Sequence, residues 1–172
     1  MPPKLEDLPS PWPAFLKEVD QALSAPLELH CLGGFVLKSP YDLPRGTDDL
    51  DHFAVIPHGA SRSCKLWADM AQSSPKSTKY KVFLQHYGAP DLPEDHERRL
   101  VQLDLDLANL SLKVLDPYDL ALSKLTRNSP KDREDVKSLA TKLQLSFEVL
   151  SQRFEAEMKP WLPASSPNCL DK

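Results

Sequence analysis

The stretch LHCLGGFVLKSPYDLPRGTDDLDHFAV, residues 29–55, decides the fold. Leu27–Leu32 is a short apolar run that predicts a strand, and it ends at Gly33 and Gly34, which predict a tight turn. Leu50–Ile56 is rich in β-branched and aromatic residues and predicts a second strand. The expected sheet is built outward from these two strands and the turn-like segment between them.

Asp49 and Asp51 stand two residues apart at the start of the second predicted strand. Alternate side chains of a strand point to one face, so the two carboxylates should lie roughly 7 Å apart on the same side. Carboxylates so placed can bracket a pair of Mg²⁺ ions, which lie ~3.5–4 Å apart in two-metal sites. An Asp-x-Asp pair on a strand also occurs by chance, so the pair alone is weak evidence for a metal site.

Gly33 and Gly34 follow the first strand and have no side chains to keep a ligand away. The backbone there can approach a triphosphate closely, with amide groups and a helix start facing the anion. Without the aspartates, the more frequent interpretation of such a pair is an ordinary turn.

The rest of the chain predicts an α/β (α+β) fold, with a small mixed sheet, flanking helices and a C-terminal helical segment. We expect a single domain over residues 1–172, with a core of about residues 10–160 and proline-rich ends. Ser10-Pro11 is expected to open a first helix. The further expected elements are a helix at 62–72, a polar loop at 73–80, strands at 101–107 and 110–115, and helices at 117–127, 130–143 and 146–159.

Asp104 and Asp106 share the polar face of the expected strand at 101–107. If that strand lay beside the Asp49 strand, one of them could join the aspartate pair and take a proton from an attacking hydroxyl. The alternative is a solvated sheet face.

Lys124, Arg127, Asp132 and Asp135 occupy the junction of two predicted helices. A lysine there is a point charge suited to phosphate oxygens. No carboxylate of its own helix lies one turn away, so loss of Lys124 is expected to weaken triphosphate binding more than folding. The two aspartates could instead be first-turn acids that complement the helix dipole.

Composition excludes several classes of protein. A net charge of −4 disfavours non-specific coating of nucleic acid. The scattered cysteines Cys31, Cys64 and Cys169 fit a reducing cytoplasm. The sequence has neither the apolar core of a signal peptide nor a run of ~18 apolar residues, so no membrane association is expected.

The glycine–aspartate stretch and LDPYDLALSKLTRNSPKDREDVKSL, residues 115–139, together resemble the nucleotidyltransferase superfamily. Within it, the chain resembles small bacterial domains related to the AbiEii abortive-infection toxins of type IV toxin–antitoxin pairs. The resemblance covers about residues 14–160. It implies metal binding by Asp49, Asp51 and Asp104, with Asp106 as the alternate third carboxylate.

The resemblance also implies a substrate site for a nucleoside triphosphate. Lys124 would touch the phosphates, and Asp132 or Asp135 would order Lys124 and Arg127. The residues expected to bind substrate are Gly33, Gly34, Arg45, Thr47, Lys124, Arg127, Asp132 and Asp135.

The predicted activity is Mg²⁺-dependent transfer of a nucleotidyl group from a nucleoside triphosphate to an acceptor hydroxyl. The gap between Gly34 and Asp49 is longer than in the commonest superfamily pattern, and the long helical C-terminal domain of the larger toxins is missing. The acceptor therefore stays open between an RNA end, a protein and a small molecule, and an antitoxin partner is a further expectation. The alternatives are an inactive binding or regulatory module of the same fold and, ranked lower, an Asp-x-Asp glycosyltransferase.

Overall fold

The computed structural model describes residues 3–57 and 64–162. The chain divides into two compact units, residues 1–88 with 101–114 and residues 89–100 with 115–172. The predicted α/β class with a mixed sheet is confirmed. The single domain expected over residues 1–172 stays a prediction.

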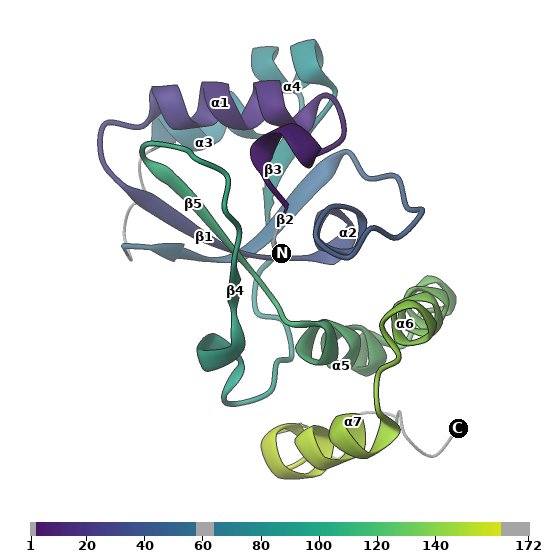
Figure 1. Cartoon of the computed structure of the whole chain (residues 1–172). Helices are drawn as coiled ribbons and strands as arrows, with labels where there is room; N and C mark the ends of the chain where they lie inside the picture. The colour runs from purple at the N-terminus through teal and green to yellow at the C-terminus, as the bar shows by residue number, and fades with distance from the viewer. Residues whose placement is uncertain (1–2, 58–63, 163–172) are drawn as a thin grey trace. The chain divides into compact units, whose positions relative to one another are not determined.

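The first unit holds a five-stranded sheet in the order β3-β2-β1-β5-β4 (Figure 1). Strand β2 is antiparallel to β1 and parallel to β3, while β5 is parallel to β1 and antiparallel to β4. The two central strands have almost the predicted limits. The strands are β1 Leu27–Leu32, β2 Asp49–Ile56, β3 Phe83–His86, β4 Val101–Gln102 and β5 Leu110–Val114.

Helices α1, α3 and α4 lie together on one side of this sheet (Figure 1). The apolar residues of α1 recur at helical spacing, and Phe15, Leu16 and Val19 are fully buried. On β2, Leu50 and His52 point to this side, because the His52 ring stacks on Trp67 of α3. The helices of the unit are η1 Leu5–Asp7, α1 Trp12–Ala22, α2 Gly33–Lys38, α3 Cys64–Met70 and α4 Pro75–Tyr80.

Two local predictions in this unit are wrong. Helix α1 begins at Trp12 with Pro11 as its N-cap, so Ser10 is not the cap. The polar loop expected at 73–80 contains the short helix α4. Ser74 caps it by accepting a hydrogen bond from the Ser77 backbone N–H at 3.0 Å, an arrangement that favours helix initiation.

The strand expected at 101–107 is also shorter than predicted. Strand β4 covers only Val101 and Gln102. Leu103 and Leu105 are buried as the alternation predicts, but Asp106 adopts a left-handed φ of 48°. A φ of this sign is incompatible with an extended strand, so regular pairing stops while the alternating burial persists.

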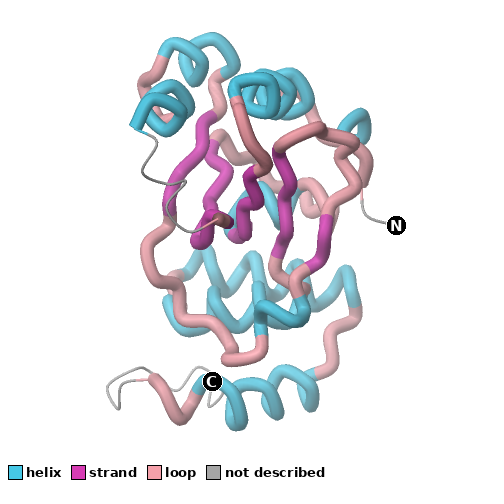
Figure 2. The backbone as a smooth tube through the Cα atoms, turned by 90° about the vertical axis from the view of Figure 1, so that its left-hand side faces the viewer, coloured by secondary structure: helices cyan, strands magenta, loops and turns pink. Residues whose placement is uncertain are grey.

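The second unit is helical apart from its connections (Figure 2). Asp116, Ser129 and Ser146 each cap a helix by accepting from a backbone N–H, so the predicted starts are confirmed. Its helices are η3 His96–Arg99, α5 Pro117–Arg127, α6 Pro130–Leu143, α7 Phe147–Arg153 and η4 Phe154–Met158, a π-type turn that continues α7. No helix of the described residues is long and apolar enough to cross a membrane.

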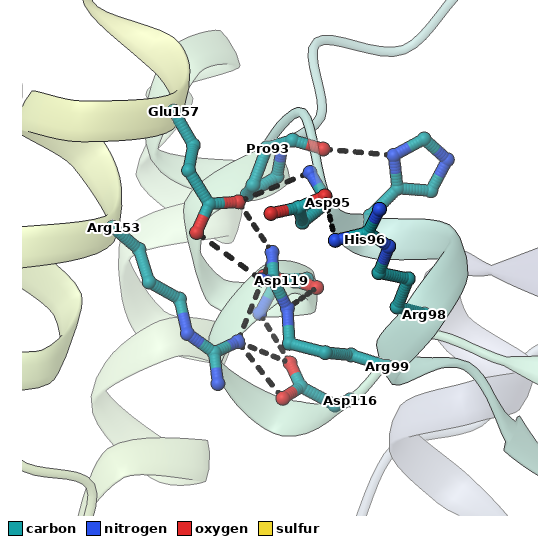
Figure 3. A network of polar contacts seen from close by, with 9 residues as sticks. All are labelled: Pro93, Asp95, His96, Arg98, Arg99, Asp116, Asp119, Arg153 and Glu157. Atoms are coloured by element: carbon teal, nitrogen blue, oxygen red, sulfur yellow. Dashed lines mark hydrogen bonds and ion pairs between the residues drawn. The ribbon is translucent and has the colours of Figure 1, made fainter.

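Ion pairs around the buried Asp119 tie the helices of the second unit together (Figure 3). Arg99 bonds Asp119 through Nε at 2.9 Å and Glu157 through Nη2 at 2.6 Å. Arg153 bonds Asp116 and Asp119 at 2.8 and 2.9 Å. Burial raises the pKa of Asp119, and the guanidinium of Arg99 opposes that rise. The network is a structural feature that the sequence did not predict.

Candidate functional site

The glycine pair packs directly against the predicted metal-binding strand. Gly33 has a φ of 80°, and a Cβ atom added to it would lie 2.3 Å from Oδ2 of Asp51. A Cβ atom added to Gly34 would lie 2.8 Å from Oγ1 of Thr47. Neither position has room for a side chain, and Gly33 also needs a conformation that glycine adopts most readily. The structure therefore brings the two motifs together, as their order in the sequence predicted.

Strand β2 presents Asp49 and Asp51 on the same face, opposite Leu50 and His52. Both aspartates are partly exposed, whereas Leu50 and His52 are buried. The Thr47 hydroxyl donates to the Asp49 carboxylate and lies 3.2 Å from the Asp49 carbonyl oxygen. Asp49 is thus held in one orientation by Thr47, which lies two residues before the start of the strand.

Neighbouring titratable groups add no positive charge beneath these carboxylates. Burial and the charge of Asp51 raise the pKa of the Cys31 thiol, so it stays protonated. Burial and the neighbouring His86 lower the pKa of His52 to about 4, so its ring is neutral at neutral pH. Neither the His52 ring nor the Cys31 thiol therefore adds a charge next to the two aspartates.

Two partly exposed carboxylates fit a hard divalent cation such as Mg²⁺, which takes oxygen ligands and keeps waters and phosphates in its shell. Asp49 and Asp51 would be the protein ligands. Within residues 3–57 and 64–162, no three side chains of His, Cys, Asp and Glu are grouped so as to hold a metal ion. The site thus offers a pair of carboxylates and not a complete protein cage.

The predicted third carboxylate is not at this pair. Strands β1 and β5 separate β2 from β4, after which Asp104 and Asp106 follow. The two aspartates instead line an open groove with Lys4 and Lys17. Because the prediction required neighbouring strands, neither Asp104 nor Asp106 can be retained as the third ligand.

Arg45 lies in the connection from α2 to β2, two residues before Thr47. Its backbone N–H donates to the carbonyl of Leu43 at 2.7 Å, and its side chain is half-buried. Its predicted substrate contact stays a prediction.

The second unit contains the Lys124 cluster, formed by Lys124, Arg127, Asp132 and Asp135. Lys124 is 4% exposed, and its Nζ lies 2.9 Å from Asp135 and 3.5 Å from Asp132. Arg127 donates hydrogen bonds to the Asp132 carboxylate from Nε, at 2.7 Å, and from Nη2. The aspartates of α6 thus hold both cations of α5, as expected from the resemblance.

The burial of Asp132 alone would raise its pKa, but hydrogen bonds from Arg127 and Ser129 lower it well below its usual range. Lys124 faces two carboxylates that are themselves buried. Lys124 is therefore paired with carboxylates of the next helix, and its predicted contact with phosphates stays a prediction.

Sequence reasoning missed one residue of the first unit. The sequence of residues 80–87 does not distinguish a helix from a strand. It therefore predicts neither β3 nor a role for Gln85. In the structure Gln85 stands opposite Asp51 in the parallel pairing of β2 and β3. The only available signal was the apolar pair that precedes it, Phe83 and Leu84, and four residues are too few for a periodicity.

Comparison with known families matches residues 15–168 to a nucleotidyltransferase of unknown function, DUF6036. The chain belongs to this family. The DUF6036 match includes both the glycine–aspartate segment and the Lys124 cluster, and it supports the predicted superfamily. Comparisons with curated proteins and with solved structures give no match.

Proposed function

We propose that this DUF6036 chain is a Mg²⁺-dependent nucleotidyltransferase that moves a nucleotidyl group from a nucleoside triphosphate to an acceptor hydroxyl. The observation that carries the proposal is the packing of Gly33 on Asp51 and of Gly34 on Thr47. This packing places side-chain-free backbone beside two carboxylates, the combination that a metal–triphosphate complex requires.

Each residue of the first unit has a defined task in this proposal. Asp49 and Asp51 would hold Mg²⁺, which when bound neutralises phosphate charge. Thr47 fixes the orientation of the Asp49 carboxylate. Gly33 and Gly34 leave their backbone open to phosphate oxygens, so the triphosphate is positioned by main chain and metal ligands together.

Within the second unit, Arg127 is the candidate phosphate-binding cation. The ammonium of Lys124 already bonds two carboxylates, whereas the Arg127 side chain is 53% exposed and anchored by Asp132. We therefore assign phosphate binding to Arg127 and the support of its helix junction to Lys124. An anchored guanidinium suits phosphate, because its fork geometry matches two oxygens at once.

The finer parts of the proposal rest on the sequence alone. These are the relation to the AbiEii toxins, an antitoxin partner, a cytoplasmic location, and an RNA, protein or small-molecule acceptor. The alternative of an inactive binding or regulatory module is favoured by one observation, the lack of a third carboxylate in the described metal site. Such a module would bind the nucleotide without transferring it.

Thermal melts of wild type and Asp49→Asn test the metal–nucleotide site. Wild type should melt at a higher temperature with Mg²⁺ and one of the four nucleoside triphosphates. At a ligand concentration 100 times Kd, the free energy of unfolding should rise by about 2.7 kcal/mol. Asp49→Asn should melt at the same or a higher temperature without metal, since it relieves repulsion from Asp51. It should lose the response to the Mg²⁺–triphosphate mixture.

Asp48→Asn is the matched control, because it removes the same charge from an exposed neighbour that lies outside β2. It should keep the full response. The contrary outcome is an Asp49→Asn variant that melts at a lower temperature without metal but still responds to the Mg²⁺–triphosphate mixture. It would show that Asp49 is structural and not a metal ligand.

A further inference from the structure

Among the described strands, two lie beside Asp51 and could supply a third metal ligand from the sheet. Strand β2 has β1 and β3 as its neighbours. On the β1 side, Asp51 faces Leu32, and the chain then turns through Gly33 against the Asp51 carboxylate. That side is occupied by the glycine turn, so a further protein ligand would have to come from β3.

On β3, the residue at the level of Asp51 is Gln85. The register pairs Asp49 with Phe83 and Asp51 with Gln85. Paired residues of adjacent strands project on the same face, so Gln85 shares the face of the aspartates. Gln85 is exposed and Phe83 is buried, which leaves Gln85 as the polar group at this position.

The opposite face of the same strands confirms this register. His52 and His86 follow the two residues in question and are paired with each other. Their ring centroids lie 5.3 Å apart on the face that also holds Trp67. The side chains of Asp51 and Gln85 therefore emerge together on the other face.

We infer that Gln85 limits the proposed metal–nucleotide site to one divalent ion, because the strand position beside Asp51 that could supply a third carboxylate carries an uncharged amide. A glutamine offers a carbonyl oxygen but no negative charge and no basic group. Asp49 and Asp51 supply two negative charges, which match a single divalent cation. The inference rests on the proposed function and explains why the described residues hold no three-ligand cluster.

The inference predicts a gain of binding from a single isosteric change, Gln85→Glu. The variant adds a carboxylate beside Asp51 without altering side-chain length, and the exposed position tolerates the change. Without metal, the third carboxylate adds like-charge repulsion, so the variant should melt at or below the wild-type temperature. Mn²⁺ should reverse that difference.

The experiment counts Mn²⁺ ions per protein by equilibrium dialysis with a saturating non-hydrolysable nucleoside triphosphate analogue. Wild type should retain one Mn²⁺ and Gln85→Glu two. Gln21→Glu is the matched control: it adds the same charge on an exposed position of α1, which lies on the other side of the sheet. It should retain one ion.

Two Mn²⁺ in wild type, or one in a folded Gln85→Glu protein, would overturn the inference. If neither protein binds the analogue with Mn²⁺, the proposed function itself fails, an outcome separate from a wrong ion count.

Discussion

Gly33→Ala is expected to weaken binding of a Mg²⁺–triphosphate complex at least tenfold. The new Cβ atom would fall 2.3 Å from Oδ2 of Asp51, so the carboxylate must leave its position. The left-handed backbone at Gly33 adds a cost of about 1–2 kcal/mol for alanine. The melting temperature without ligand measures the backbone cost of alanine. Its rise with nucleotide at fixed Mg²⁺ measures the loss of binding.

Two other glycine variants make this prediction specific. Gly34→Ala meets Thr47 at 2.8 Å without a left-handed φ, so its effect should be smaller. Gly46→Ala is the control, because nothing lies within 4 Å of its Cβ position. The expected order of loss is Gly33, Gly34, Gly46. Equal binding by all three variants would show that the glycine pair has no part in the site.

Lys124→Met is expected to lower the free energy of unfolding by about 3–5 kcal/mol, the cost of breaking a buried ion pair from one side. Lys124 Nζ bonds Asp135 at 2.9 Å, and both residues are buried. The variant would remove the Lys124 ammonium from the Asp135 carboxylate, while Asp132 would keep Arg127. Denaturant unfolding followed by circular dichroism measures the loss.

Lys131→Met is the control for this variant, since Lys131 is an exposed lysine of the same junction. It should change stability by no more than about 0.5 kcal/mol. The double variant Lys124→Met/Asp135→Leu should recover part of the loss, because it also removes the buried carboxylate that Lys124 contacts. If the Lys124→Met variant were as stable as the wild type, the Lys124–Asp135 pair would have no structural role.

The sequence predicted those parts of the fold that are encoded locally. Strand β1 has the expected limits because it is a short apolar run. Helices α5 and α6 have the expected limits because each starts with a capping aspartate or serine followed directly by a proline. The proximity of the Gly33 turn and Asp51 was also predictable, since both belong to consecutive elements of one motif.

The errors concern contacts that the chain makes over long distances. Alternation at 101–107 showed which face Asp104 shares but not which strand lies beside it, and the observed strand order excludes it from the site. Strand β3, with Gln85, is too short to show a period.

A nucleotidyl-transfer assay tests the central claim most directly. The protein is incubated with each α-³²P-labelled nucleoside triphosphate, Mg²⁺, and total RNA, protein or small-molecule extract. Wild type should transfer label to one of these acceptors, and Asp51→Asn and samples with excess chelator should not. Equal labelling by wild type and Asp51→Asn, or no labelling of any acceptor by a wild-type protein that binds Mg²⁺–triphosphate, would contradict the assignment as a transferase.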